Sequence, residues 1–444
     1  MKLSRIISLF LALMMLLVMI CSCNHEEKPE KYKDGVIGAR ETGIFEGLYE
    51  VADGIIGGKE YSKAAEGRYE AEVLTPTAAE FYPEPGTNTV QPTAGLLTAG
   101  ESRDISKLDE WLETYIKENF DGFYKQRGLY STNIVPVKVQ TGTSSVFNQK
   151  AELYSDSDEL LYTATTDING EAFLFYSDAY ANNLGYVKVN GEKQDVIVGN
   201  KTEFLKFDLN LKSGEIKELD LMLMVDTTGS MGDELEYLKA ELVDMVGRIS
   251  ESKETLSIRV SVNFYRDEGD EYIVKYYDFR TDINECLSQI KEQSAQGGGD
   301  YPEAVHTALE NAVTGHTWRE NAVKICFFVL DAPPHTESEI QGINSSILKS
   351  VTKAAELGIR IIPVASSGVD KDTEYILRSF ALMTGGTYIF LTNHSGIGGS
   401  HIDPSVSDYK VEPLNECMIR VVCEYCGLEY VSRYTYTEKP VEQQ

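Results

Sequence analysis

The chain has 444 residues, with 70 Asp and Glu against 41 Lys and Arg, which gives a net charge of -29. This length allows several domains, and 42% hydrophobic with 10% aromatic residues is ordinary for globular folds. The acidic excess repels nucleic acid, so the sequence predicts no DNA or RNA partner. Diffuse negative charge attracts divalent cations in general, but it does not by itself make a binding site.

The first 23 residues have the pattern of an export signal. Lys2 and Arg5 precede an apolar run from 6 to 20, which is short for a membrane-spanning helix. The run closes on Cys21-Ser22-Cys23, which resembles the bacterial lipobox. That resemblance implies lipidation at Cys23, with 1–23 a lipoprotein signal peptide and 24–44 a linker. We expect an exported protein, held on the cell membrane and facing outside the cytoplasm; a plain secretory signal or an uncleaved helix is the alternative.

The other cysteines are odd in number and lack the spacing of a disulfide framework. They are Cys286, Cys326, Cys417, Cys423 and Cys426. The last two form a C-x-x-C string, but they lie on a predicted amphipathic helix. We therefore expect buried small hydrophobic side chains in preference to redox or zinc chemistry.

Residues 45–130 form an N-terminal region whose fold the sequence does not indicate. It is rich in Gly, Thr, Pro and Tyr, and it includes a segment at 92–101 to which no chemistry can be assigned. A short helix is predicted after this segment, because apolar residues recur at helical spacing and should dock against the later domains. These residues are Leu108, Trp111, Leu112, Tyr115 and Ile116.

From 131 to 215 the apolar residues alternate with period two, which predicts a small all-β sandwich. Val135, Val137 and Val139 begin the pattern. Further strands are expected near 151–154, 172–176, 186–189 and 203–211. The turn at 166–172 resembles the T-D-x-x-G-x-A turn of carboxypeptidase-regulatory-like and other immunoglobulin-like domains. We expect its Asp and Asn side chains to cap the turn, in preference to binding calcium.

From 216 to 427 apolar strands alternate with helices, and 428–444 is a C-terminal tail. Strands are predicted at 219–225, 256–265, 271–279, 323–330, 359–366 and 387–392. Helices are predicted near 231–250, 301–314, 337–357, 371–384 and 411–426. Nearly continuous apolar runs, such as 221–225, are typical of a sheet covered on both faces. The sequence therefore predicts a doubly wound, Rossmann-like α/β domain with an antiparallel hairpin at 256–279.

Ligands of such folds bind at the carboxyl ends of the strands, and three acidic loops follow predicted strands there. The loops span 226–231, 297–303 and 331–335. Their carboxylates and hydroxyls suit Mg²⁺ or Ca²⁺, which need oxygen ligands, and Mn²⁺ is a further option. The candidate metal ligands are Asp226, Thr228, Ser230, Asp300, Glu303 and Asp331.

The string at 226–230 resembles the D-x-S/T-x-S motif of the metal-ion-dependent adhesion site (MIDAS) in von Willebrand factor type A domains. That resemblance covers roughly 218–427, and 92–101 looks like a segment that recurs upstream of bacterial A domains. It implies that a partner protein supplies an Asp or Glu carboxylate to the bound ion, in adhesion or in assembly of an envelope complex. The string at 300–303 looks more like integrin β subunits. This implies that Glu303 is a direct ligand, and that a second ion could lie near Asp267, Asp300, the Pro302 carbonyl and Glu303.

Two other functional classes remain open. A metal-dependent hydrolase could use His335 and His316 near Asp331, but the chain has no H-E-x-x-H or G-x-S-x-G string and only 6 histidines. A structural envelope lipoprotein with an inactive A domain is the third class. We expect a binding protein and not an enzyme.

Overall fold

The computed structural model describes residues 33–38, 92–197, 203–212, 214–251 and 256–433. The expected signal peptide, its Cys23 and most of the linker at 24–44 lie outside these residues. Within the described ranges, no helix combines the length and the apolar character needed to cross a membrane.

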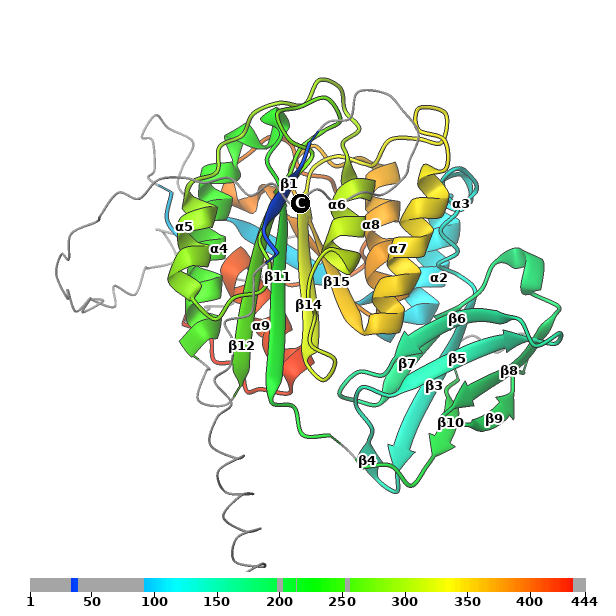
Figure 1. The fold of residues 1–444 in the computed structure, drawn as a ribbon. Helices are drawn as coiled ribbons and strands as arrows, with labels where there is room; N and C mark the ends of the chain where they lie inside the picture. Colours follow the sequence, from blue (N-terminus) through cyan, green and yellow to red (C-terminus); the bar gives the residue numbers. More distant parts are fainter. Residues whose placement is uncertain (1–32, 39–91, 198–202, 213, 252–255, 434–444) are drawn as a thin grey trace, which may run out of the picture. The chain divides into compact units, whose positions relative to one another are not determined.

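A sheet of nine strands is the centre of the larger folded part (Figure 1). Its order is β1-β13-β12-β11-β14-β15-β16-β2-β17. In that order the strands span Gly35–Ile37, Val274–Tyr276, Ser257–Tyr265, Glu218–Asp226, Val323–Leu330, Ile359–Ala365, Tyr388–Leu391, Thr98–Ser102 and Glu412–Pro413. β12, β11, β14, β15 and β16 are parallel to their neighbours in this series, and β13 is antiparallel to β12 as the hairpin prediction requires.

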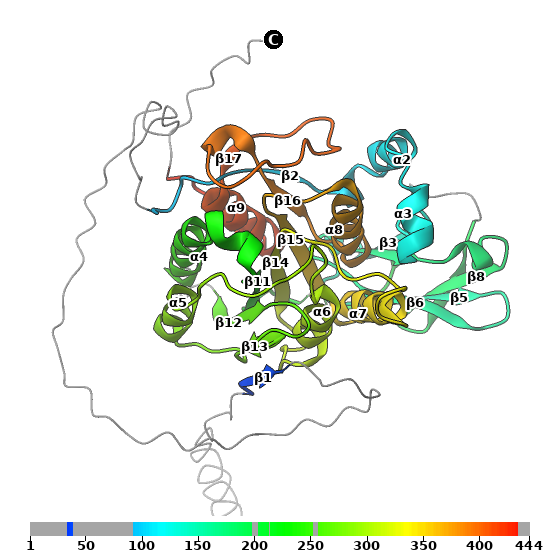
Figure 2. The ribbon, with the colours of Figure 1, turned by 90° about the horizontal axis from the view of Figure 1, so that it is seen from above.

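Helices cover both faces of this sheet (Figures 1 and 2). α4 (Leu235–Ser250), α5 (Ile283–Lys291) and α9 (Leu414–Cys426) pack on one face, and α6 (Val305–Thr314), α7 (Ile343–Leu357) and α8 (Lys371–Thr384) on the other. Successive side chains of a strand point to opposite faces. Leu221 and Leu223 therefore join the core under α4, α5 and α9, whereas Met222 and Met224 join the core under α6, α7 and α8. The predicted doubly wound α/β fold is confirmed.

The helix α5 was not predicted, although its sequence carries a readable signal. Asp282 is its N-cap and accepts a hydrogen bond from the Asn284 amide at 3.1 Å. Ile283, Cys286 and Ile290 recur at helical spacing and are buried. This helix returns the chain from β13 to the loop at 297–303, which begins with three glycines and is called the glycine-rich loop below.

The sheet extends beyond the range 216–427, because β1 and β2 come from the N-terminal part of the chain. β2 lies antiparallel to both β16 and β17, so the segment at 92–101 completes the sheet. After it, α2 (Leu108–Lys117) and α3 (Asp121–Arg127) lie against α8. The Tyr375 hydroxyl and the Leu129 carbonyl share a hydrogen bond, and Arg378 pairs with Asp104 at 2.8 Å.

The docking of α2 differs from the prediction at one residue. Leu108 and Trp111 are buried, and the Trp111 indole N–H donates to the Ser131 carbonyl at 3.0 Å. Ile116, expected on the same face, is 78% exposed. The helix ends one residue later, and in this last turn Tyr115 packs against the core while Ile116 points away from it.

The all-β part consists of two four-stranded sheets. One contains β3 (Ile134–Thr141), β4 (Ser144–Ser145), β7 (Glu171–Phe175) and β10 (Leu205–Asp208), and the other β5 (Lys150–Ser155), β6 (Leu160–Thr165), β8 (Leu184–Val189) and β9 (Glu192–Asp195). Pairing is antiparallel except between β10 and β3. In the turn at 166–172, Asp167 Oδ1 accepts the amides of Asn169 and Glu171 at 2.9 and 3.0 Å. The side chain thus caps the turn, as predicted.

Candidate functional site

The chain order reverses at β11, which lies between β12 and β14. A crevice opens at the carboxyl ends of the strands where such a reversal occurs, and ligands of doubly wound folds bind there. Asp226 is the last residue of β11, and Asp331 directly follows β14. The topology therefore brings two of the candidate ligands to this point.

The loop after β11 folds back on the carboxylate of Asp226. Asp226 Oδ1 accepts hydrogen bonds from the Thr228 amide at 2.8 Å and from its hydroxyl at 2.6 Å. The Thr228 hydroxyl also lies 3.1 Å from that of Ser230. The other oxygen, Asp226 Oδ2, is buried and has no hydrogen-bond partner among the described residues.

The glycine-rich loop is fastened to this first loop by backbone hydrogen bonds. The Gly229 amide donates to the Gly297 carbonyl at 3.0 Å, and the Gln296 amide donates to the Thr227 carbonyl at 3.0 Å. A Cβ on Gly298 would lie 3.0 Å from Glu303 Oε1 and 3.4 Å from Thr228 Cβ. Glu303 and Thr228 therefore lie close to both sides of Gly298, and the φ of +70° at this residue favours glycine.

The third loop is joined to the second at Glu303. The Glu303 amide donates to the Pro333 carbonyl at 2.9 Å, and Glu303 forms an isolated parallel bridge with Pro334. Asp331 is 4% exposed and Glu303 is 2% exposed. The three loops thus hold the carboxylates of Asp226, Glu303 and Asp331 in one buried region.

Burial and mutual repulsion make it unfavourable for all three carboxylates of this three-carboxylate cluster to be ionised at once. Burial raises the pKa of Glu303 to about 10, and the charges of Asp226, Asp267 and Asp331 add to this shift. Burial and the charge of Asp226 raise the pKa of Asp331 to about 8. Burial also raises the pKa of Asp226 to about 6, although hydrogen bonds from Thr228 oppose the shift. A bound cation would offset these penalties.

The donor atoms fit a hard divalent cation. Asp226 Oδ2, Glu303 Oε2 and Asp331 Oδ1 are all buried without a hydrogen-bond partner among the described residues, which is costly for a carboxylate oxygen. Within that part of the chain, the three carboxylates do not form a group whose oxygens all lie within 4.8 Å of one another. An ion between them would also need the hydroxyls of Thr228 and Ser230, or water, as ligands.

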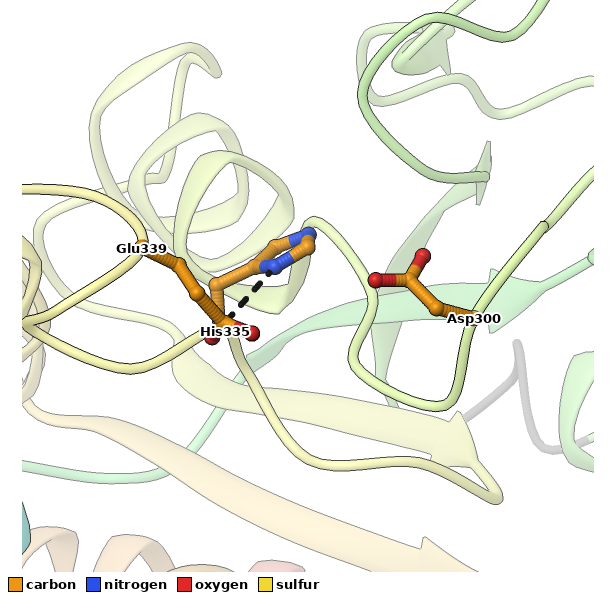
Figure 3. A group of neighbouring side chains, drawn as sticks. All are labelled: Asp300, His335 and Glu339. Carbon is orange, nitrogen blue, oxygen red and sulfur yellow. Dashed lines mark ion pairs between the residues drawn. The ribbon is translucent and has the colours of Figure 1, made fainter.

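Two further candidates have partners outside this cluster, although the charge of Asp267 contributes, after burial, to the raised pKa values of Asp226 and Glu303. Asp300 is exposed, and its carboxylate neighbours His335 and Glu339 (Figure 3). Asp267 Oδ1 lies 2.8 Å from His335 Nε2. Of the residues expected around a second ion, Glu303 lies with Asp226 and Asp300 with His335, whereas Asp267 interacts with both groups.

The two histidines considered for a hydrolytic centre have separate partners. His316 Nε2 lies 3.1 Å from Asn311 Oδ1, and its Nδ1 lies 3.7 Å from Asp278 Oδ1. The ring of His316 also packs edge-on against Phe279. These partners differ from those of His335, so each histidine has its own polar environment.

The structure adds two residues that the sequence did not indicate. Glu234 is 1% exposed and accepts the Ser367 amide at 2.8 Å, and its charge contributes to the raised pKa of Asp331. Arg127 donates to the carbonyls of Pro334 and His335 at 3.1 and 3.0 Å. No local sequence pattern indicates the Arg127 contact, because more than 200 residues separate Arg127 from Pro334 in the chain.

Comparisons with known proteins match only part of the chain. Residues 220–398 match the family model for the von Willebrand factor type A domain. An ariadne-like RING finger protein of Acanthamoeba polyphaga mimivirus is 34% identical over 120 residues, and the alpha-protein kinase vwkA of Dictyostelium discoideum is 27% identical over 118. These matches cover 27% and 26% of this chain but 12% and 19% of the relatives. The chain thus spans less than a fifth of each relative.

A comparison with solved structures also gives a partial match. It is the conserved hypothetical protein BatB from Bacteroides thetaiotaomicron, with a TM-score of 0.33 and 14% identity. The match covers 47% of this chain and 99% of that one. The family match and the doubly wound sheet with its flanking helices agree. Residues 220–398 of this chain are a von Willebrand factor type A domain.

Proposed function

We propose that this chain binds a partner protein through a divalent cation held at the three-carboxylate cluster. The observation that carries the proposal is the set of buried, unpartnered oxygens on Asp226, Glu303 and Asp331. Mg²⁺ and Ca²⁺ take such oxygens together with hydroxyls like those of Thr228 and Ser230. The cation is the MIDAS ion that the family resemblance implies.

The partner supplies an Asp or Glu carboxylate to a position that the ion leaves open. Without the ion, the acidic chain as a whole repels such a partner, since it carries a net charge of -29. With the ion, the local field is positive enough to attract a carboxylate. Binding is therefore expected to depend on the cation, and no catalytic step is assigned to the site.

Tyr301 is the best candidate for an additional contact with the partner. It is 43% exposed, and its hydroxyl donates to the Gly368 carbonyl at 3.0 Å. A tyrosine held in this way presents a rigid, partly exposed ring, and tyrosine is enriched among the residues that dominate binding energy at interfaces. Tyr301→Ala is expected to weaken partner binding without weakening cation binding.

Chelation is expected to abolish partner binding. The full chain, immobilised in detergent, is used to capture partners from envelope extract with Mg²⁺ or with excess EDTA. A partner that depends on the bridging ion is retained only with Mg²⁺, and Asp331→Asn loses it under both conditions. Asp109→Asn is the matched control, because it removes one exposed carboxylate far from the cluster in sequence. Retention in excess EDTA, or after neutralisation of every acidic residue of the partner, contradicts the bridging mechanism.

We also propose that the chain is exported and anchored to the cell membrane through a lipid on Cys23. The support is the basic and apolar pattern before Cys21-Ser22-Cys23. Cys23→Ser is expected to lose lipid labelling and to move the protein out of the membrane fraction, whereas Cys286→Ser should change neither. Equal labelling and equal membrane association of the Cys23 variant and the parent contradict the anchor.

A further inference from the structure

A second group of metal-type side chains lies beside the three-carboxylate cluster. One ligand atom each from Asp300, His335 and Glu339 can be chosen so that all lie within 4.8 Å of one another. Figure 3 shows the His335 ring between the two carboxylates, with Asp300 approaching from the glycine-rich loop and Glu339 from the turn after β14. Two separate loops therefore contribute to this group.

The buried histidine is held in one orientation by a neighbouring carboxylate. His335 is 8% exposed, and its Nε2 lies 2.8 Å from Oδ1 of Asp267, which is 5% exposed. An ionised carboxylate only accepts hydrogen bonds, so Nε2 carries the hydrogen. In a neutral ring the lone pair then lies on Nδ1.

That lone pair faces another carboxylate. His335 Nδ1 lies 3.8 Å from Glu339 Oε2, which is beyond hydrogen-bond distance. Two electron-rich atoms that face each other at this separation repel, unless a proton on the ring or a cation between them changes the sign. Protonation of His335 is the competing explanation, and the experiment below distinguishes the two.

We propose that Asp300, His335 and Glu339 form a second cation site, for a divalent transition metal of the zinc type. Zinc ligands in proteins include histidine nitrogen at about 2.0–2.1 Å and carboxylate oxygen at about 2.0–2.2 Å. A metal-bound histidine usually donates its other N–H to a carboxylate, which is the position of Asp267. The nitrogen ligand distinguishes this site from the all-oxygen cluster, which suits Mg²⁺ or Ca²⁺.

Surrounding contacts orient the Glu339 carboxylate and hold the backbone of His335. Glu339 Oε2 accepts the amide and the hydroxyl of Thr336 at 2.7 and 2.8 Å, which orients the carboxylate. Arg127 holds the His335 carbonyl from α3. A metal at this site therefore ties the turn after β14 to the loop that carries Glu303. Three protein ligands leave at least one position for water or for a partner's side chain.

Zinc titration of the full chain tests the site. The protein is first saturated with Mg²⁺, and Zn²⁺ is then added in a calorimeter. One Zn²⁺ is expected to bind per chain, His335→Gln is expected to weaken it by about 100-fold or more, and Glu339→Gln by at least about 10-fold. His394→Gln is the matched control, since His394 is exposed and distant in sequence from the group. Asp226→Asn is expected to keep Zn²⁺ binding, so failure of the proposed partner function does not affect this result.

Three outcomes overturn the proposal. The first is equal Zn²⁺ affinity of the His335 and His394 variants. The second is loss of the Zn²⁺ site in Asp226→Asn alone, with the Glu339 variant unaffected. The third is no Zn²⁺ binding by the parent below millimolar concentration, which leaves a protonated His335 as the account of the geometry. Glu339 is exposed, so its variant keeps the test valid even if the buried His335 variant folds poorly.

Discussion

Replacing Asp226 with asparagine is expected to remove most Mg²⁺ binding while leaving the cation-free protein as stable as the parent, or more stable. The substitution removes one of three mutually repelling buried carboxylates, and burial has already raised the pKa of Asp226 to about 6. The asparagine oxygen can still accept the Thr228 amide. Loss of a direct ligand should weaken Mg²⁺ binding by about 100-fold or more, because even changes behind the ligands cost about 10- to 100-fold.

The measurement is the thermal stability of the full chain with and without Mg²⁺. A ligand at 100 times its Kd stabilises the native state by about 2.7 kcal/mol, so the parent should show a clear rise in Tm. The Asp226→Asn variant should show little or none, and Asp109→Asn should respond like the parent. Equal responses of parent and Asp226→Asn would place the cation elsewhere. A large loss of cation-free stability would instead indicate that Asp226 acts mainly as a cap for its loop.

The same cluster predicts how pH changes stability. The folded-state pKa values of Asp226 and Asp331, about 6 and about 8, are raised above those of an unfolded chain. These groups therefore stabilise the cation-free protein fully below about pH 4, and that contribution is lost as pH rises towards about 8. Mg²⁺ competes with the protons, so its stabilising effect should grow over the same range. A larger Mg²⁺ effect at pH 5.5 than at pH 8 would contradict the assignment.

The residues of the candidate cluster could be predicted from the sequence because each lies in a short string of residues that is recognisable by itself. Asp226 ends a strand, Asp331 directly follows one, and Glu303 lies just before a helix. A buried parallel strand is readable as an apolar run. The rule that ligands bind at strand carboxyl ends then brings the loops together. The hydroxyls of Thr228 and Ser230 follow from the same string of residues.

What the sequence did not indicate depends on contacts between distant residues. Asp267 and His335 are 68 residues apart, so their hydrogen bond leaves no local pattern. The Arg127 contact spans even more of the chain. Asp300 and Glu303 are close in sequence but belong to different groups of side chains, since Glu303 is 2% exposed and Asp300 is exposed. The path of the backbone between Asp300 and Glu303 sends the two side chains to different groups, and their spacing in the sequence does not reveal this.

The segment at 92–101 is also held by contacts with residues distant in the sequence, which the sequence did not indicate. Breaking these contacts is expected to have the largest effect on stability. Glu241, on α4, is completely buried, and its carboxylate accepts the amides of Gly95, Leu96 and Leu97 at 2.8–3.0 Å. The next residues form β2, where Ala99 is buried. One side chain of the A domain thus fastens a strand that begins more than 140 residues earlier.

Glu241→Ala is expected to destabilise the protein by about 3 kcal/mol or more. The substitution leaves three backbone amides without their acceptor, and each unsatisfied buried group costs about 1–3 kcal/mol. Since whole domains are stable by only about 5–15 kcal/mol, the loss should shift urea unfolding of the full chain strongly. Glu241→Gln keeps one acceptor oxygen and should lose less. Glu236→Ala, on the exposed face of the same helix, should change stability by about 0.5 kcal/mol at most.

Hydrogen exchange can separate this attachment from a general loss of packing. If the carboxylate of Glu241 fastens the strand, the amides of Leu97 and Ala99 should exchange faster in Glu241→Ala under native conditions, before global unfolding. Amides of β11, such as that of Leu223, should remain protected, because their partners on β12 and β14 are unchanged. Uniform acceleration of both sets would mean that the substitution weakens the whole core. Unchanged exchange at Leu97 and Ala99 would mean that the pairing of β2 with β16 holds the segment without Glu241.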